Sequence, residues 1–252
     1  MRGLRGKAIA VIGGGGIGGA TAQRLAEEGA RVAIGDIDLA GAEAIAGRIN
    51  AAGGMAISRR CDIADERSIA DFIAATVGEF DGLDGLHANA ADMEAVRSDK
   101  DVLSTPMEVF DRTVQADLRG HILCTRIALP ELLKRGGGAL VYTSSESALR
   151  GAENVYAYSS AKAGLIPLAR HVAFTWGRQG IRANVIAPGA VLTETLKRGA
   201  KPEMLDAFRA ISCSTRLGQP EDIAAMAAFL LSDDAIWING QTINVNGGSL
   251  MR

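Results

Sequence analysis

The stretch "AVIGGGGIGGAT", residues 10–21, holds six glycines in the seven positions from Gly13 to Gly19. Glycine loses more backbone freedom on folding than any other residue, so such a run destabilises any helix or strand that contains it. The run therefore needs a structural reason. Gly13, Gly15 and Gly18 satisfy the pattern G-x-G-x-x-G, which becomes informative only in the right surroundings.

The sequence on either side of the glycines predicts a strand, a tight turn, a helix and a second strand. "KAIAVI" (7–12) is short, apolar and rich in β-branched residues, as buried strands are. "ATAQRLAEEGA" (20–30) favours a helix that stops near Gly29, and "RVAIGDID" (31–38) indicates a second buried strand ending at Asp36. This order is typical of a dinucleotide-binding unit.

Such a unit explains the glycines. The backbone must turn tightly and approach a pyrophosphate without Cβ atoms in between, and the helix N-terminus offers free N–H groups to the phosphates. A carboxylate at Asp36 can accept both hydroxyls of the adenosine ribose, whereas a 2′-phosphate would be repelled. We expect NAD rather than NADP, because Arg59 and Arg60 are the only basic residues nearby.

The composition is that of an ordinary globular protein and narrows the choice of partners. Of the 252 residues, 48% are hydrophobic and 22% are charged, and the net charge of −2 comes without a basic block, which argues against nucleic acid. No apolar run is long enough for a membrane span or a signal peptide. The three cysteines are far apart, which favours buried free thiols in the cytoplasm and no metal site.

Strand and helix patterns alternate along the whole chain. We expect further strands at 54–62, 85–91, 138–145, 182–189 and 241–248, and helices near 66–80, 107–134, 156–179 and 220–231. This alternation predicts an α/β fold, a Rossmann-like doubly wound parallel sheet in three α/β/α layers. Residues 1–252 form a single domain in this interpretation, with a cofactor half at about 1–140 and a catalytic and substrate half at about 141–252.

Ligands of such sheets bind beyond the carboxyl ends of the strands, where reactive side chains occur. Ser145 ends one predicted strand, and "YSSAK" places Tyr158 and Lys162 on one face of a helix. A free phenol has a pKa of about 10, and a nearby ammonium group lowers it toward the range of a general base. Ser145 would then hold the substrate oxygen. Taken singly, these residues also fit a solvated Tyr–Lys pair and turn-forming serines.

The chain resembles the short-chain dehydrogenase/reductase family over essentially its full length. The resemblance rests on the following stretches: the glycine loop, Asp36, Asp62, "ANAA" (88–91), Ser145, "YSSAK" (158–162), "NVIAPGAVLT" (184–193) and "RLGQPEDIAAMAAFLLSDDAIWINGQTINVNGG" (216–248). A tyrosine and lysine at this spacing, with a serine thirteen residues upstream, form a specific combination.

The resemblance implies roles for individual residues. Ser145, Tyr158 and Lys162 would be catalytic, Asp62 would contact the adenine, and Asn89 would brace the central strand. Thr193 would hold the nicotinamide carboxamide, which Val191 would touch by its backbone. The implied cofactor-binding set is Gly13, Gly15, Gly16, Ile17, Gly18, Asp36, Ile37, Asp62, Ile63, Asn89, Ala90, Tyr158, Lys162, Pro188, Gly189, Val191 and Thr193. Family members are commonly homotetramers.

Three departures from the family pattern stand out. Ile12 replaces the usual threonine before a glycine loop that is one residue shorter, and Ala91 replaces a glycine. Asp117 stands where the family has a catalytic asparagine, which acts largely through its backbone carbonyl. We therefore count Asp117 among the catalytic residues. Its side chain would either lie near Lys162 and oppose ionisation of Tyr158, or point away toward Arg119 or Arg112.

The sequence as a whole predicts an oxidoreductase that passes hydride between NAD(H) and a secondary alcohol or its ketone, with Tyr158 as acid and base. The alternatives are an NADPH-dependent 3-oxoacyl carrier-protein reductase and a nucleotide-binding sensor without catalysis. The substrate is a small molecule whose identity the sequence leaves open. Its pocket should involve residues near 92–100, 146–156 and 190–215, and the last of these segments reads as a mobile flap.

Overall fold

The computed structural model describes residues 1–251 and contains a fully parallel sheet in the order β3-β2-β1-β4-β5-β6-β7. The strands are β1 (Ala8–Ile12), β2 (Arg31–Asp36), β3 (Met55–Arg60), β4 (Gly85–Ala88), β5 (Gly138–Thr143), β6 (Ile181–Pro188) and β7 (Thr242–Val245). The sequence order reverses direction between β1 and β4. Ligands bind at such a switch point in open α/β sheets.

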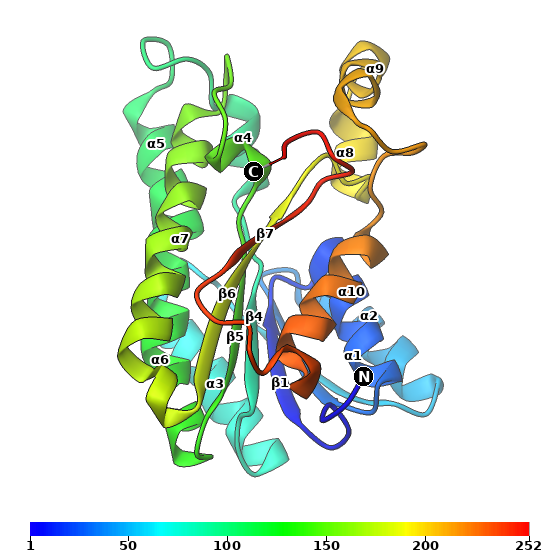
Figure 1. Cartoon of the computed structure of the whole chain (residues 1–252), viewed down its shortest axis with the longest axis vertical. Coiled ribbons are helices and arrows are strands. Elements are labelled where there is room, and N and C mark those ends of the chain that lie inside the picture. Colours follow the sequence, from blue (N-terminus) through cyan, green and yellow to red (C-terminus); the bar gives the residue numbers. More distant parts are fainter. Residues whose placement is uncertain (252) are drawn as a thin grey trace.

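Helices cover both faces of the sheet (Figure 1). One layer consists of α3 (Glu66–Phe80), α6 (Gly120–Lys134) and α7 (Tyr156–Trp176), and the other of α1 (Ile17–Glu27), α2 (Leu39–Ala51) and α10 (Pro220–Leu231). The apolar faces of these helices pack on β-strands whose side chains are buried on both sides, which is why β1 reads as a continuous apolar run. The predicted doubly wound, single-domain α/β fold is confirmed.

Four shorter helices lie toward the carboxyl ends of the strands. They are α4 (Met93–Ser98), α5 (Met107–Val114), α8 (Glu194–Gly199) and α9 (Pro202–Ile211). In Figure 1 they occupy the same end of the molecule, with α4 and α5 on one side and α8 and α9 on the other. The segment 190–215, which we expected to be a flap, therefore contains two helices joined by a short link.

The helix predicted over 107–134 contains a wider turn. Residues 107–134 are helical throughout, as predicted, but Gln115–Arg119 form a π-helical segment between α5 and α6 that the sequence pattern does not show. Single π-helical turns inside α-helices occur frequently at functional sites. Hydrophobic periodicity misses such a turn, because one wider turn hardly changes the apolar pattern.

The structure bears on two further expectations, which concern membrane-spanning segments and the burial of the cysteines. None of the helices in residues 1–251 has the length and apolar character needed to cross a membrane. The thiols of Cys61 and Cys124 are buried and unpaired, as expected, but Cys213 is exposed, so the prediction of three buried thiols is wrong for this residue. Cys213 lies two residues after the end of α9, near the end of the 190–215 segment.

A matched pair of glycine substitutions tests the packing around the π-helical segment. A Cβ at Gly120 would lie 2.5 Å from the carbonyl oxygen of Ile63, whereas a Cβ at Gly47 meets nothing within 4 Å. We expect Gly120→Ala to lower the free energy of unfolding by about 1–3 kcal/mol, the usual range for overpacking. Gly47→Ala should raise it by about 0.5–1 kcal/mol, because alanine favours a helix. Urea denaturation measures both, and a stabilising Gly120→Ala would contradict the packing.

Candidate active site at the carboxyl ends of the strands

A cleft of about 690 Å³ runs across the carboxyl ends of β1, β2, β4, β5 and β6. Its walls come from the glycine loop, the ends of these strands and the helices α4, α7, α8 and α9. Of the residues predicted to act in catalysis or cofactor binding, the following line it: Gly13, Gly15, Gly16, Ile17, Asp36, Ile37, Asp62, Ile63, Asn89, Ala90, Ser145, Tyr158, Lys162, Pro188, Gly189, Val191 and Thr193.

Gly18 and Asp117 are the two predicted residues outside this lining. A Cβ at Gly18 would lie 1.8 Å from the carbonyl oxygen of Gly13, so only glycine lets α1 pack this closely against the loop. Gly18 thus has the helix-packing role of the third glycine in the dinucleotide-binding pattern. Asp117 is completely buried behind the cleft.

Side chains from neighbouring strands hold the glycine loop in place. Asp36, at the end of β2, accepts hydrogen bonds through Oδ2 from the backbone N–H groups of Gly14 and Gly15, at 2.6 and 3.2 Å. The Nδ2 group of Asn89, which follows β4, donates to the carbonyl oxygen of Gly13 at 2.9 Å. Gly13 itself has a φ of +93°, a conformation that favours glycine. The loop is therefore ordered by the protein.

The end of the cleft near Asp36 is acidic. Asp36 and Asp62 both line it, together with the apolar side chains of Ile37 and Ile63. Arg60 is not part of this lining, and its guanidinium lies 4.0 Å from the carboxylate of Asp62. Within the described residues, no lysine or arginine faces the cleft beside Asp36. This charge pattern disfavours a phosphate group, and each carboxylate oxygen has a second lone pair with which it can accept a hydrogen bond from a hydroxyl group.

The segment after β6 crosses close to the glycine loop. Thr193 caps α8, its Oγ1 accepting a hydrogen bond from the N–H of Leu196 at 3.1 Å. Its methyl group would lie 2.9 Å from a Cβ at Gly16, so the two segments approach as closely as a glycine allows. A bridge between Val191 and Gly218 joins the start of the 190–215 segment to the chain just after its end.

Ser145, Tyr158 and Lys162 lie together on the wall formed by β5 and α7. The Nζ atom of Lys162 lies 5.6 Å from the centroid of the Tyr158 ring. The neighbouring Ser144 fastens α7 to the end of β5, because its Oγ donates to the carbonyl oxygen of Lys162 at 2.8 Å. Tyr158 and Lys162 thus share one helical face, as their spacing predicts, and that face points into the cleft.

The π-helical segment brings Asp117 onto Lys162. Oδ1 of Asp117 lies 3.1 Å from Nζ of Lys162, and the two side chains are 0% and 1% exposed. Of the alternatives that the sequence leaves open, the structure therefore has the pairing with Lys162. Arg112 instead forms ion pairs with Asp92 and Glu94, at 2.9 and 3.2 Å.

The buried pair acts on the tyrosine. Burial raises the pKa of Tyr158 well above that of a free phenol, and the negative charge of Asp117 raises it further, while a hydrogen bond with Ser145 lowers it. Burial also raises the pKa of Asp117, against the attraction of Lys162. Without a bound cofactor or substrate, Tyr158 is a neutral phenol that can donate a proton.

The cleft also contains residues that the sequence analysis did not name individually. Its lining also includes Cys61, Ala64, Ala91, Asp92, Met93, Glu94, Arg112, Ala116, Thr143, Ser144, Ala190, Thr195, Leu196 and Phe208. Six of these lie on α4, α5, α8 and α9, whose short patterns carry little periodicity. Segments 92–100 and 190–215 contribute as expected, but no residue of 146–156 lines this cleft.

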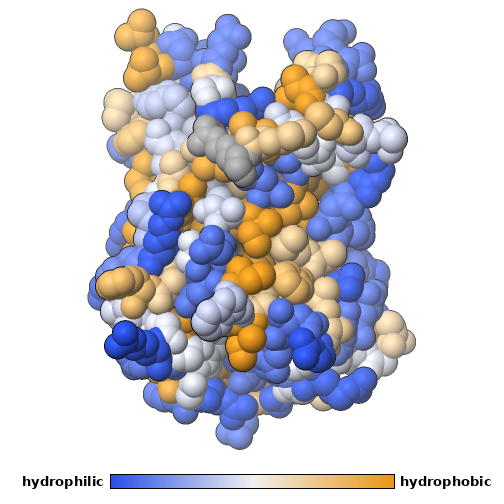
Figure 2. All heavy atoms as spheres, viewed as in Figure 1, coloured by the Kyte–Doolittle hydropathy of each residue, from blue (hydrophilic) through white to orange (hydrophobic). Residues whose placement is uncertain are grey.

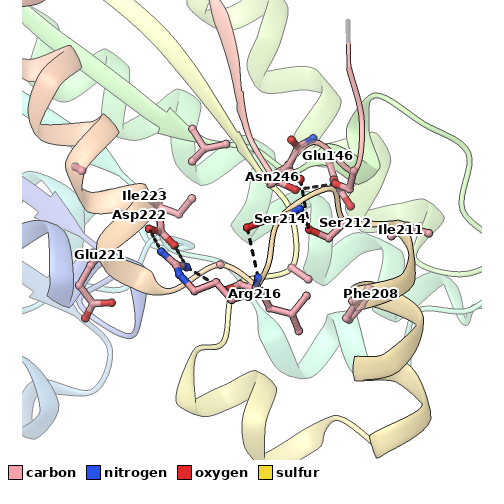
Figure 3. Close-up of a pocket in the computed structure, with 17 residues that line it drawn as sticks. Glu146, Phe208, Ile211, Ser212, Ser214, Arg216, Glu221, Asp222, Ile223 and Asn246 are labelled. Carbon is pink, nitrogen blue, oxygen red and sulfur yellow. Dashed lines mark hydrogen bonds and ion pairs between the residues drawn. The ribbon is translucent and has the colours of Figure 1, made fainter.

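Glu146 instead lines a second cavity of about 460 Å³ behind the 190–215 segment (Figure 3). Figure 3 shows Ser212, Ser214 and Arg216 on the chain that returns from α9, with Arg216 paired to Asp222. The C-terminal residues form another wall, where Ser249 donates a hydrogen bond to Glu146 and the N–H of Cys213 donates to Gly247 at 2.9 Å. Ala190 and Phe208 line both cavities.

Comparisons with known proteins agree with this geometry. The family model described as enoyl-(acyl carrier protein) reductase matches residues 11–249. The chain is 42% identical to a probable short-chain type dehydrogenase/reductase of Bradyrhizobium diazoefficiens, over 98% of this chain and 88% of that protein. It is 38% identical to cis-4-hydroxycyclohexanecarboxylate dehydrogenase of Sinomonas cyclohexanicum, over 95% of both proteins.

A solved structure shares the whole fold. The 7α-hydroxysteroid dehydrogenase complexed with NADH and 7-oxo-glycochenodeoxycholic acid superposes with a TM-score of 0.91 at 34% identity, over 99% of this chain and 97% of that one. Coverage, identity and fold agree along nearly the full length. The chain belongs to the short-chain dehydrogenase/reductase family and is an oxidoreductase that acts on alcohol and ketone groups.

Proposed function

We propose that this protein is an NAD-dependent dehydrogenase/reductase for secondary alcohols on an aliphatic ring. The observation that carries the proposal is the placement of Ser145, Tyr158 and Lys162 in one cleft with the glycine loop and Asp36. A proton-transferring group and a dinucleotide cradle thus face the same space. One end of the cleft supports the choice of NAD as cofactor, and the other supports the choice of a ring-shaped substrate.

The cleft fits NAD. The glycine loop has no Cβ atoms between its backbone and a pyrophosphate, and Asp36 stands at the end of β2 where the ribose hydroxyls of such a ligand lie. Gly13, Gly15, Gly16 and Ile17 would hold the pyrophosphate, and Thr193 the nicotinamide carboxamide. When bound, the nicotinamide supplies hydride exchange with the substrate carbon. The NADH in the solved relative favours the same cofactor here.

Tyr158 would exchange the proton of the substrate oxygen, which Ser145 holds by a hydrogen bond. The Nζ atom of Lys162 lies near the ring of Tyr158, and its positive charge favours the phenolate form of that tyrosine. Burial keeps Tyr158 protonated at neutral pH, which suits it to donate a proton during ketone reduction. Alcohol oxidation needs the phenolate and should therefore be favoured at higher pH.

Asp117 would tune this exchange. Its carboxylate neutralises Lys162 and repels the phenolate, so it shifts the balance of Tyr158 toward the protonated form. Asp117 would in this way bias the enzyme toward reduction at neutral pH. Its backbone carbonyl would have the role that the resemblance gives to the family's asparagine.

The substrate end of the cleft presents apolar side chains beside the polar Asp92, Glu94 and Arg112, and the apolar ones support a ring-shaped substrate. Met93 lies on one side, and Leu196 and Phe208 lie on the other, carried by α8 and α9. The names of two relatives specify a hydroxylated cyclohexane ring and a hydroxysteroid. We propose that residues 190–215 act as a flap that closes over such a ring.

Two other functions make different demands. A 3-oxoacyl carrier-protein reductase that uses NADPH needs a cation beside Asp36, and none lines the described cleft there. A nucleotide sensor without catalysis would have no use for Tyr158 and Lys162 side by side in the cleft. Neither alternative is favoured by the site.

We propose a homotetramer located in the cytoplasm. Phe174 and Trp237 are 94% and 96% exposed, and aromatic residues are enriched at protein–protein interfaces. Figure 2 shows hydrophobic residues gathered in the middle of the face that carries β7 and α10, beside the open edge of the sheet. The unpaired thiols of Cys61, Cys124 and Cys213 fit a reducing compartment.

Turnover with ring alcohols tests the function and the cofactor together. We expect oxidation of cyclohexanol or cis-4-hydroxycyclohexanecarboxylate with a kcat/KM for NAD at least about tenfold above that for NADP, equivalent to about 1.4 kcal/mol. Asp36→Ala should reduce this preference. Asp38→Ala is the control and should keep the preference, because Asp38 caps the start of α2. Equal use of NADP, or reduction of an acetoacetyl thioester with NADPH alone, would refute the proposal.

Tyr158→Phe should lower kcat by about 10²- to 10⁴-fold, the usual contribution of a general acid–base group. The ring remains, so NADH should bind as in the wild type when followed by fluorescence titration. Tyr156→Phe is the matched control, because Tyr156 stacks on Phe110, with ring centroids 6.1 Å apart. A greater loss of activity in Tyr156→Phe would reverse the assignment.

Asp117→Asn should move the pH dependence of alcohol oxidation. Removing the carboxylate charge lowers the pKa of Tyr158, so the rise in rate with pH should occur about one unit lower, the effect of roughly 1.4 kcal/mol. Asp111→Asn removes the same charge from the exposed side of α5 and should leave the profile in place. An unchanged profile in Asp117→Asn, or a rise at higher pH, would contradict the electrostatic role.

A further inference from the structure

The helix that carries Tyr158 begins without a cap of its own. Its first flanking residue, Val155, has no side-chain hydrogen-bonding group and lies in the left-handed region at φ 65° and ψ 36°. A β-branched residue rarely adopts this conformation, and such strain persists only where the surrounding structure enforces it. The free N–H groups of the first turn therefore need a partner from elsewhere in the chain.

That partner is Asp99, which is 59 positions away in the sequence. Its Oδ2 accepts a hydrogen bond from the backbone N–H of Tyr158 at 2.9 Å. Tyr158 occupies the third position of the helix, where the capping side chain of an ordinary helix accepts its hydrogen bond. Asp99 is only 5% exposed, and its negative charge suits a helix N-terminus.

The carboxylate of Asp99 is itself fixed. Thr105 Oγ1 lies 3.2 Å from Asp99 Oδ1 and 3.0 Å from the carbonyl oxygen of Asp101, so its one proton is shared between these acceptors, and it accepts from the N–H of Lys100 at 2.8 Å. The loop 99–105 is thereby closed onto itself with Asp99 aimed at α7. Both carboxylate oxygens have defined partners, so the position of Asp99 is transmitted to the backbone of Tyr158.

Asp99 also ends α4, whose first residues line the cleft. Asp92 caps the start of this helix through Oδ1, and Met93 and Glu94 face the space where substrate would lie. A helix of only six residues thus connects the cleft wall at one end with the backbone of Tyr158 at the other. A displacement of the wall would be carried to the acid–base residue through Asp99.

We propose that Asp99 is a positioning residue that sets the place of the Tyr158 hydroxyl by capping α7 from outside. The proposal rests on the function proposed above, since it assigns Tyr158 the proton transfer. Catalysis is sensitive to displacements of about 1 Å, so loss of the cap should lower the rate of the chemical step more than it weakens cofactor binding.

Three variants test this. Asp99→Ala should lower kcat by about tenfold or more and leave the KM for NAD within about twofold, because a group needed only in the transition state is displaced. Asp99→Asn should retain kcat within about threefold, since its amide oxygen can still accept from Tyr158 and its NH₂ group can donate to Thr105. Asp101→Ala removes the same kind of side chain from the same loop, where it caps Leu103 and Ser104, and should leave kcat unchanged.

Hydrogen exchange separates this proposal from the proposed function. In Asp99→Ala, amide exchange of the peptide covering residues 156–162 should become faster than in wild type, and in Asp101→Ala it should not. This measurement does not need enzymatic turnover, so it tests whether Asp99 caps α7 even if no ring alcohol is oxidised. Lack of activity on every ring alcohol would contradict only the proposed function. Unchanged exchange in Asp99→Ala would overturn the proposal, as would an unchanged kcat or an Asp99→Asn variant as impaired as Asp99→Ala.

Discussion

All seven strands of the sheet run in one direction, and this constraint decides where chemistry can take place. Parallel strands need crossovers, and the crossover helices bury both faces of the sheet, so only its ends remain for ligands. β1 is followed by the glycines of the loop, β2 ends at Asp36, and β5 is followed by Ser144 and Ser145. The side chains of the site come together because the strands that carry them all end at the same edge.

Within this frame, the ion pair between Asp117 and Lys162 is the most unusual electrostatic feature. Two buried charges cost desolvation that their attraction only partly offsets, so such a pair is weak support for stability and suggests a functional reason. It joins α7 to the π-helical segment between α5 and α6, which is also where the backbone deviates from regular helix. The buried ion pair, the π-helical segment and the acid–base tyrosine therefore lie next to one another. A change in the position or charge of one of them alters the surroundings of the other two.

Much of the fold and of the site could be predicted from the sequence, because both depend on periodic patterns and local motifs. All seven strands and the cleft residues of the glycine loop, Asp36 and "YSSAK" follow from such signals. The side-chain direction of Asp117 does not, because it depends on a π-helical turn that apolar spacing hardly records. The bond from Tyr158 to Asp99 was equally invisible, since it joins a helix start without a capping residue to an irregular loop. Short helices such as α4 and α8 were missed because six residues carry too little periodicity.

The hold of Asp36 on the glycine loop bears on cofactor affinity. Fixing the backbone of one residue costs about 1–2 kcal/mol, and a glycine-rich loop ordered only by its ligand would subtract that cost from every binding event. Here the carboxylate of Asp36 holds Gly14 and Gly15, and Asn89 holds Gly13, before any dinucleotide arrives. The ordering is thus completed during folding, and the cradle is preorganised. A loop built from the most flexible residue can in this way behave as a rigid receptor.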